Sequence, residues 1–578
     1  MIKKLAKSIR EYKKPAILTS ISVMLEVIME VLIPYVMASL IDEGVSCGDI
    51  SATLKYGLIL TIMAIMSLFF GFLSGSFCAT ASSGFSKNLR KDMFEKIQTF
   101  SFSNIDKYSS AGLVTRLTTD ISYVQNAFQM LIRLAIRAPL MLIFTIIMTI
   151  SINAQLSLVF AVAGPILCLL IFLVLRKVHP SFKKVIQEYE DLNRVVEENV
   201  RGARVVKSYV REDYEIEKFD ITSEQIYKDY SHARKLMSLN SPIMSATAYA
   251  CLLVISFLGA KIIVNSGGTA LECGQLTTMF SYTMQILSSL LMFSYVLMGF
   301  TISRPSAERI VEILDEVPSI KNPESPIMKV KNGDIDFENV SFSYKGDISK
   351  LCLKDVNLHI KSGETIGILG ATGSSKTTLV SLIPRLFDAT SGEIFVGGKN
   401  VKEYDLAVLR DSVSMVLQKN VLFSGTVKEN LLWGNKNASD EEIKQACDIA
   451  CASEFVEKMP EKYDTHIEQG GSNVSGGQKQ RLCIARALLK KPKILILDDS
   501  TSAVDTKTDA RIKKALRETM PKVTKIVIAQ RVSSVQDADR IIILDGGKIV
   551  AIGSHKELLK TSDLYNEIYN SQTKKGGK

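Results

Sequence analysis

Cysteine is sparse in this chain and has no metal-binding pattern. The nine cysteines among 578 residues stand at positions 47, 78, 168, 251, 273, 352, 447, 451 and 483, and none has the spacing of a metal site. A disulfide framework is also excluded as the basis of the fold, because such frameworks stabilise short secreted chains. Cys47 and Cys273 fall in predicted outer loops, where we expect two free thiols; a bridge between them is the alternative.

Charge is missing from four long stretches of the first half. They cover residues 56–86, 138–175, 236–260 and 273–303. A bilayer-spanning helix needs roughly 20 mostly apolar residues, so each stretch can span at least once, and 138–175 can span twice with a turn at 151–155. With 47% hydrophobic residues and a mean hydropathy of +0.17, the chain is neither an ordinary soluble enzyme nor a disordered protein.

Six membrane spans are therefore predicted. Residues 15–41 form another span, interrupted only by Glu26 and Glu30, so the full set is 15–41, 56–86, 134–151, 156–176, 236–261 and 274–303. Lys and Arg concentrate in residues 1–14 and in the two long loops, and the first short loop is acidic. The positive-inside rule then places both termini and both long loops in the cytoplasm. The net charge of +10 fits a membrane protein, and no nucleic-acid partner is expected.

The N-terminal residues are predicted to lie on the inner leaflet. Apolar residues at positions 2, 5, 9 and 12 share one helical face, with lysines opposite, so residues 2–12 are expected to form an interfacial helix. The first apolar run is too long for a cleavable signal peptide and lacks a cleavage site.

The two long loops have helical patterning with few helix-breaking residues. We therefore expect the membrane helices to continue through 87–130 and 180–235 into the cytosol. Their turning points are predicted near Phe102–Tyr108 and Val206–Asp213, where they could touch whatever lies below the membrane.

Glu26 and Glu30 share one face of the first span because they are four residues apart. Carboxylates inside a membrane are costly and usually face a cavity or a partner. One interpretation is a site for cationic substrate or protons. The other, which we favour, is structural pairing with Arg133 or Arg137.

The second half begins after a proline-marked linker at 317–328 and changes character. Short β-type runs alternate with amphipathic helices, which predicts an α/β domain. The strand-like run 365–369 leads into Gly370-Ala371-Thr372-Gly373-Ser374-Ser375-Lys376-Thr377, and a helix is expected at 378–387. This strand–loop–helix order is typical of a phosphate-binding loop, in which backbone N–H groups and a lysine meet phosphate oxygens.

Further motifs follow in a specific order. A buried-strand run, 494–498, ends in a carboxylate suited to the Mg²⁺ side of a P-loop site, and Ser475-Gly476-Gly477-Gln478 precedes it. Together with Tyr344, Gln418 and Ser502-Ala503-Val504-Asp505, this order resembles an ATP-binding cassette. Six spans fused ahead of one cassette resemble a half-size ABC exporter, and the resemblance covers the whole chain.

The resemblance implies a role for each matching residue. The implied ATP-binding residues are Tyr344, which would stack on adenine, and Gly370, Thr372, Gly373, Ser374, Ser375, Lys376, Thr377, Thr378, Gln418 and Asp498. Thr377, Gln418 and Asp498 would hold Mg²⁺. Ser475, Gly476, Gly477 and Gln478 would form the signature that meets the ATP of a second cassette, and Asp505 and Glu468 would lie at interfaces. The single tryptophan, Trp433, is expected to be a packing residue.

Three positions depart from the family pattern. Ser375 replaces a glycine of the phosphate loop, Asp499 replaces the glutamate that acts on the attacking water, and Gln530 replaces a histidine near the γ-phosphate. None of the five histidines, at 179, 232, 359, 466 and 555, can fill that last position. Aspartate is one methylene shorter than glutamate, and glutamine cannot carry a proton or a positive charge.

These departures resemble the degenerate-site subunit of bacterial heterodimeric multidrug exporters. The implied catalytic positions are Asp499, Gln530 and Gln418, in an impaired site. The intact signature would complete the competent site of a partner that carries the catalytic Glu and the switch His. Slow homodimeric export is one alternative. An ATP-gated channel or regulatory subunit without transport of its own is the other.

The predicted fold is multi-domain: an all-α polytopic membrane domain with six transmembrane helices and long cytosolic extensions, then an α/β P-loop ATPase domain. The predicted boundaries are 1–14 (elbow helix), 15–316 (membrane domain), 317–328 (linker), 329–572 (cassette) and 573–578 (polar tail). ATP and Mg²⁺ are the expected cofactors. Besides the second half-transporter, the expected partners are membrane lipid and a small amphipathic or hydrophobic substrate of the drug or lipid class. The expected location is a bacterial plasma membrane.

Overall fold

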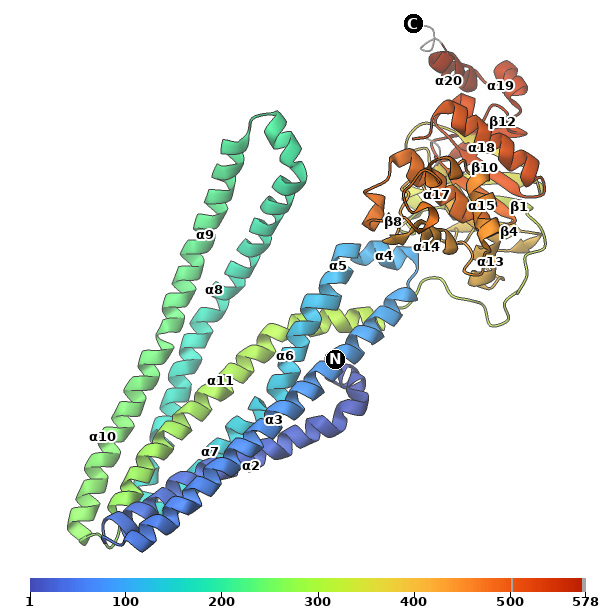
Figure 1. Ribbon diagram of the computed structural model, residues 1–578. Helices are drawn as coiled ribbons and strands as arrows, with labels where there is room; N and C mark the ends of the chain where they lie inside the picture. Colours follow the sequence, from blue (N-terminus) through green and yellow to red (C-terminus); the bar gives the residue numbers. More distant parts are fainter. Residues whose placement is uncertain (500–502, 574–578) are drawn as a thin grey trace. The chain divides into compact units, whose positions relative to one another are not determined.

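The computed structural model describes residues 1–499 and 503–573, and the chain divides into two compact units (Figure 1). The first, the helical unit, contains Met1–Gln98 and Ala111–Glu316. The second, the C-terminal unit, contains Val317–Lys578 together with the short segment Thr99–Ser110. The domain boundaries given above remain predictions.

The helical unit is built from long helices. In chain order they are α2 (Lys13–Ser39), α3 (Ile50–Gln98), α5 (Ser110–Thr115), α6 (Ile121–Ile132), α7 (Leu134–Ile152), α8 (Ala154–Ser208), α9 (Glu212–Ser238), α10 (Asn240–Ser266) and α11 (Cys273–Asp315). In the described part of the chain, six helical stretches are long and apolar enough to cross a membrane, and each contains one predicted span. The α-helical membrane architecture is therefore confirmed.

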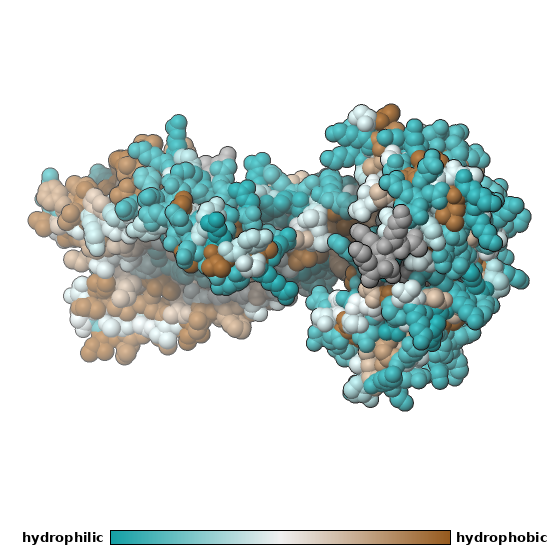
Figure 2. Space-filling view, turned by 90° about the horizontal axis from the view of Figure 1, so that it is seen from above, coloured by the Kyte–Doolittle hydropathy of each residue, from teal (hydrophilic) through white to brown (hydrophobic). Residues whose placement is uncertain are grey.

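The apolar side chains of these helices are largely exposed, as expected for a surface in contact with lipid. On α3, Leu54, Leu68 and Phe72 are each 70% exposed or more. Figure 2 shows hydrophobic residues gathered over part of the helical unit and a mainly hydrophilic surface on the C-terminal unit. A helix satisfies its own backbone hydrogen bonds, so it can carry such side chains into hydrocarbon.

The helices extend beyond the predicted spans, as the patterning indicated. Helix α8 has 55 residues, and α9 runs back beside it after a turn at residues 209–211. At about 1.5 Å per residue, α8 is far longer than a bilayer is thick. The turn lies within the predicted Val206–Asp213 region, and α4 (Phe102–Tyr108) coincides with the other predicted turning point.

The N-terminal residues are helical over the predicted range with one break. Helix α1 (Ile2–Leu5) is followed by the 3-10 helix Ala6–Tyr12, which is interrupted at Arg10, whose φ is 42°. The ring of Tyr12 lies against Gly84 of α3, where a Cβ would come within 2.3 Å of the ring. Ser8 Oγ donates to Asp92 Oδ2 at 2.7 Å, which holds this segment on α3.

The two intramembrane glutamates are paired with Arg137 of α7. The Arg137 Nη2 atom donates to both carboxylate oxygens of Glu30 at 2.7 Å, and Nη1 forms an ion pair with Glu26. Ser74 Oγ of α3 also donates to Glu26, at 3.2 Å. Of the two arginines suggested by the sequence, Arg137 makes the pairs.

Each of the nine cysteines lies in the described part of the chain, and each is a free thiol. Cys47 and Cys273 are both exposed and unbridged, so the favoured expectation for them is confirmed.

Two sheets form the framework of the C-terminal unit. The strands β1 (Ile335–Phe342), β2 (Leu353–Ile360), β4 (Ser391–Val396) and β5 (Lys399–Asn400) form an antiparallel sheet in the order β2-β1-β4-β5. The other sheet has the order β12-β11-β3-β10-β9-β6 and consists of β3 (Thr365–Leu369), β6 (Val413–Val416), β9 (Ile494–Asp498), β10 (Thr524–Ile528), β11 (Arg540–Asp545) and β12 (Lys548–Gly553). Only β12 in this sheet is antiparallel to its neighbour.

Helices surround the six-stranded sheet. They include α12 (Lys376–Ser381), α13 (Leu406–Ser412), α14 (Val427–Leu432), α15 (Asp440–Ile449), α16 (Ser453–Val456), α17 (Gly476–Leu489), α18 (Thr506–Thr519), α19 (His555–Thr561) and α20 (Asp563–Thr573). All five residues of β9 and of β10 are buried, which explains their continuous apolar runs. The carboxyl ends of parallel strands lie at one edge of a sheet, so the loops after β3, β9 and β10 come together there.

One predicted helix is shorter than expected. The sequence suggested a helix through 378–387, but α12 ends at Ser381 and turns follow. Pro384 explains the difference, because a proline lacks an N–H group and disfavours helical geometry in the residue before it.

Candidate nucleotide-binding site

The phosphate-binding loop lies between β3 and α12, as its motif predicted. Lys376 Nζ donates to the carbonyl oxygens of Gly370 and Ala371, each at 2.8 Å, so the ammonium group is folded back over the loop. Burial lowers the pKa of Lys376. A Cβ on Gly370 would come within 2.2 Å of the Leu544 carbonyl oxygen, so only glycine fits there. A phosphate group would supply acceptors for this cation and for the loop N–H groups.

Two oxygen ligands for a divalent cation meet beside the loop. Thr377 Oγ1 donates to Asp498 Oδ2 at 2.7 Å, and Asp498 is only 2% exposed. Burial raises the pKa of Asp498. A hydroxyl and a carboxylate are the hard oxygen ligands that Mg²⁺ takes alongside nucleotide phosphates, so these residues fit that ion.

Asp499, one of the three predicted catalytic residues, forms hydrogen bonds with the other two. Gln530 Nε2 donates to Asp499 Oδ2 at 3.1 Å, and the side chain of Gln418 also hydrogen bonds to this carboxylate. Burial raises the pKa of Asp499, and these two hydrogen bonds oppose the shift. The geometry brings Gln418, Asp499 and Gln530 together after β6, β9 and β10 respectively.

Ser375 occupies a backbone position that favours glycine. Its φ is 72° and its ψ is 26°, in the left-handed region, and Gly373 nearby has a φ of 86°. The glycine of the family pattern would adopt this conformation without the steric cost that a Cβ brings. The departure at Ser375 therefore has a physical cost in the backbone, in addition to any effect of its side chain on phosphate.

The proposed adenine platform, Tyr344, contacts Thr378 through its hydroxyl and two phenylalanines through its ring. Its hydroxyl lies 2.9 Å from Thr378 Oγ1. Its ring meets Phe342 at 4.9 Å and Phe387 at 5.2 Å between centroids, both edge-on. Half of the Tyr344 side chain remains exposed, which leaves surface for a stacked base. Sequence reasoning missed both phenylalanines, because ring contacts between distant positions have no local pattern.

The signature residues form a well-made helix start. Ser475 is the N-cap of α17, and its hydroxyl accepts from Gln478 N at 3.3 Å while Gln478 Oε1 accepts from Ser475 N at 2.9 Å. This capping box leaves the first N–H groups of α17 available to an anion. In the described part of the chain, no hydrogen bond joins Ser475–Gln478 to the phosphate loop, so the two elements are not brought together.

The two predicted interface residues occupy loop positions. Asp505 caps α18 by accepting a hydrogen bond from Thr508 N at 2.9 Å. Hydrogen bonds from the backbone and side chain of Thr508 lower the pKa of Asp505. Glu468 accepts from Ser472 Oγ at 2.5 Å within the loop before α17. Ser502, which precedes Asp505 in its motif, lies outside the described residues.

Trp433 is not a buried packing residue. Its side chain is 67% exposed and stacks on Phe423, with 4.3 Å between ring centroids. The predicted packing contact is therefore present, but at the surface; neither composition nor local pattern reveals which apolar side chains stay there.

Comparisons with known proteins agree with this geometry. Residues 16–290 match the family model "ABC transporter transmembrane region", and residues 353–502 match the model "ABC transporter". The chain is 36% identical over 564 residues to YfiB of Bacillus subtilis, an uncharacterized ABC transporter ATP-binding protein; the match covers 98% of this chain and 97% of that protein.

Other relatives match over nearly their whole length as well. An uncharacterized ABC transporter ATP-binding protein of Mycobacterium bovis is 32% identical over 98% of both chains. YknU of Bacillus subtilis, with the same description, is 31% identical over 97% of this chain and 95% of its own. The chain therefore belongs to the ABC transporter family, as a half-size multi-pass membrane protein in which one membrane domain is fused to one ATP-binding cassette.

Proposed function

We propose that this chain is one half of a heterodimeric ABC exporter of a bacterial plasma membrane, with both termini in the cytoplasm. Two cassettes would pair head-to-tail, so that each ATP lies between the phosphate loop of one chain and the signature of the other. This chain would contribute a degenerate ATP site and an intact signature. Transport would move drug-like or lipid-like amphipathic compounds out of the cytoplasm or inner leaflet by alternating access.

The observation that carries the proposal is the contrast within the cassette. The phosphate-loop side departs from the active pattern at Ser375, Asp499 and Gln530, whereas the signature keeps its serine, both glycines and a formed capping box. Neutral Gln530 donates to Asp499 and supplies no positive charge for the γ-phosphate. Three coincident departures on one side are better explained by a dedicated non-hydrolysing role than by independent drift.

ATP and Mg²⁺ have identifiable places in this site. Tyr344 offers a ring face to adenine, Lys376 offers its charge to the β- and γ-phosphates, and Thr377, Asp498 and Gln418 offer oxygens to Mg²⁺. When bound, the ion would neutralise phosphate charge. Asp499 is shorter than glutamate, and the loss of general-base placement costs roughly 10²- to 10⁴-fold in rate. The site would therefore hold ATP and hydrolyse it slowly.

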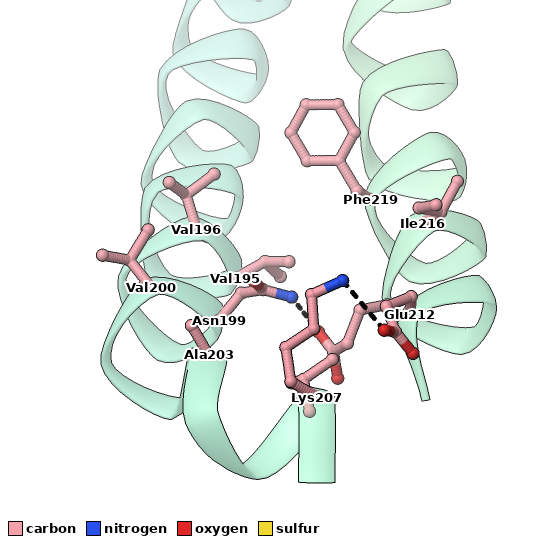
Figure 3. A pocket seen from close by; sticks show the side chains of 11 residues that line it. Val195, Val196, Asn199, Val200, Ala203, Lys207, Glu212, Ile216 and Phe219 are labelled. Atoms are coloured by element: carbon pink, nitrogen blue, oxygen red, sulfur yellow. Dashed lines mark hydrogen bonds and ion pairs between the residues drawn. The ribbon is translucent and has the colours of Figure 1, made fainter. Parts of the chain in front are cut away.

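Exposed apolar side chains on the α8–α9 hairpin favour the presence of a second membrane subunit. Between the two helices lies an open cavity of about 470 Å³, lined by apolar side chains such as Val200, Ile216 and Phe219 (Figure 3). The hairpin end is tied by Lys207 Nζ, which donates to Glu212 Oε1 at 2.9 Å. Tyr209 and Val210 in the turn are 75% and 81% exposed. Exposed apolar groups on a cytosolic element favour burial against a partner chain.

The alternatives remain distinguishable. A slow homodimer would use Asp499 as its own base, and a channel or regulatory subunit would bind ATP without moving substrate. The predicted outer loops are short and no large insertion separates the two halves, which favours export.

The test is ATP hydrolysis by the purified chain in lipid nanodiscs, with nucleotide binding measured in parallel. We expect MgATP to bind with negligible turnover, and turnover to appear on co-purification with a half-transporter that carries the Glu and His. Robust turnover by the chain alone, abolished by Asp499→Asn, would establish the homodimer instead.

A further inference from the structure

Four aromatic rings connect the adenine platform with helix α4. Phe387 meets Tyr344 at 5.2 Å, Phe342 at 5.7 Å and Phe102 at 6.0 Å between ring centroids. Phe102 is the first residue of α4 and stands more than 200 residues before the others in the chain. Among the described residues, Phe387 is the only one of these four rings that contacts the other three.

Helix α4 is also held at its start by the residues that open the linker. The hydroxyls of Ser101 and Ser103 lie 2.6 and 2.8 Å from Ser319 Oγ, and Asn104 Nδ2 donates to the Val317 carbonyl oxygen at 3.3 Å. These contacts set the position of α4, so Phe102 approaches Phe387 from a defined side.

The orientation of Tyr344 depends on few contacts. Its hydroxyl lies within hydrogen-bonding distance of Thr378, and its ring contacts Phe342 and Phe387 in nearly perpendicular arrangements of 79° and 88°. Tyr344 is half exposed, so the two perpendicular ring contacts and one hydrogen bond hold the ring on which a base would stack. Removing one ring contact would leave the Tyr344 ring with one perpendicular neighbour and one hydrogen bond.

We propose that Phe387 is a positioning residue that fixes the Tyr344 ring for adenine and couples it to α4 through Phe102. Binding of the base and docking of α4 then stabilise one another, and the coupling is reciprocal by thermodynamic linkage. This inference rests on the proposed role of Tyr344 as the adenine platform. It concerns the base alone, because the phosphate loop binds phosphates through separate groups.

The phosphates and the base can be separated experimentally with Mg-tripolyphosphate, which lacks adenine. Titration calorimetry on the full chain in nanodiscs would compare MgATP with Mg-tripolyphosphate. Aromatic edge contacts of this kind correspond to affinity changes of roughly 3- to 10-fold. We expect Phe387→Ala to weaken the binding of MgATP by that factor and to leave the binding of Mg-tripolyphosphate unchanged. The MgATP affinity of Phe387→Leu should lie between those of Phe387→Ala and the unaltered chain. Phe395→Ala, on β4 outside the four-ring cluster, is the matched control and changes neither.

A double-mutant cycle tests the coupling itself. Phe102→Ala is expected to weaken the binding of MgATP about 3-fold when Tyr344 is present, and to leave the MgATP affinity unchanged in a Tyr344→Leu background. By reciprocity, MgATP should slow amide hydrogen exchange in residues 101–108 more than Mg-tripolyphosphate does, and Phe387→Ala should abolish that difference.

The outcomes separate this proposal from the proposed function. Equal weakening of both ligands by Phe387→Ala, or no effect of Phe102→Ala on MgATP, would overturn the coupling while ATP binding stands. If the unaltered chain bound Mg-tripolyphosphate as tightly as MgATP, Tyr344 would not be an adenine platform, and both proposals for that residue would fail.

Discussion

Two groups of acidic side chains, one in each unit, each contain a buried carboxylate, and the two groups differ in how that charge is compensated. In the helical unit, Glu26 and Glu30 share Arg137. In the C-terminal unit, Asp498 receives only a hydroxyl hydrogen bond from Thr377, and it takes part in none of the ion pairs among the described residues. Lys376, although close enough to lower the pKa of Asp498, binds loop carbonyls instead.

The difference distinguishes a structural charge from a functional one. A buried carboxylate that is matched by a guanidinium holds helices together, and it leaves little free-energy gain for a ligand. A buried carboxylate without such a match is costly in the empty protein, and a divalent cation relieves that cost. By this criterion, we interpret Glu26 and Glu30 as structural, and we expect Asp498 to bind a cation.

The largest expected effect is at Asp499. Restoring the family residues with Asp499→Glu and Gln530→His should raise ATP turnover by roughly 10²-fold or more, because a longer carboxylate and an ionisable side chain return to the γ-phosphate. Hydrolysis by the purified double variant in nanodiscs, against the unaltered chain, measures this. Asp499→Asn with Gln530→His is the matched control and should stay inactive. A double variant as slow as the original would place the defect elsewhere in the site.

The second effect concerns Arg137. Arg137→Met should cost about 3–5 kcal/mol of folding free energy, because it leaves the buried carboxylate of Glu26 without its counter-charge. Thermal unfolding of the detergent-solubilised protein would report the loss. Adding Glu26→Gln and Glu30→Gln to Arg137→Met should recover most of it, since no charge is then stranded.

Arg133 provides the control for this experiment. It lies one turn from Arg137 and forms none of the ion pairs among the described residues, so Arg133→Met should cost about 1 kcal/mol or less. Equal losses for the two arginine variants would mean that the glutamates are not held by Arg137 alone.

Much of the fold follows from local patterns in the sequence. The six spans are visible because a bilayer imposes a minimum apolar length, and β3 and β9 begin and end where their apolar runs do. The phosphate loop is equally local. Its function depends on a continuous stretch of backbone, so its residues are adjacent in the chain as well as in space.

Other features depend on contacts between distant residues. Arg133 and Arg137 are four residues apart and share a helix face, so the sequence could not say which one reaches Glu26. Phe102 and Phe387 meet across more than 280 positions, and neither stands in a motif. Trp433 is exposed and stacks on Phe423, and neither the exposure nor the partner can be read from composition. Long-range packing therefore sets the limit of prediction here.

A third expectation concerns pH. Burial raises the pKa of Asp498, so the folded, cation-free protein binds this proton more tightly than the unfolded chain does. Its stability should therefore rise as pH falls through that raised pKa, and Mg²⁺-dependent nucleotide affinity should fall over the same interval. Asp498→Asn should weaken both dependences and leave the smaller contribution that Asp499, whose pKa burial also raises, makes in the same direction. Unfolding and binding measured between pH 4 and 7 give the two curves.

Asp505 should show the opposite sign. Its pKa is lowered by the N–H and hydroxyl groups of Thr508, so its contribution to stability is present above the pKa of an ordinary aspartate and is lost as pH falls. Unfolding free energies of Asp498→Asn and Asp505→Asn, measured against pH, test this difference. If both substitutions changed the pH dependence of stability with the same sign, burial and hydrogen bonding would not shift the pKa values of these two carboxylates in opposite directions.

The smallest expected effect is in the backbone of the phosphate loop. Ser375 has a φ of 72°, so Ser375→Gly should stabilise the nucleotide-free protein by roughly 1 kcal/mol through relief of a left-handed conformation. Gly373→Ala is the matched opposite change: its φ is 86° and no atom lies within 4 Å of the added Cβ, so only the backbone term acts and should destabilise by a similar amount. Thermal unfolding of both variants tests the pair. If Ser375→Gly left stability unchanged while Gly373→Ala lowered it, the serine side chain would be compensating its own strain, and the departure at this position would be an adaptation of the loop rather than a defect in it.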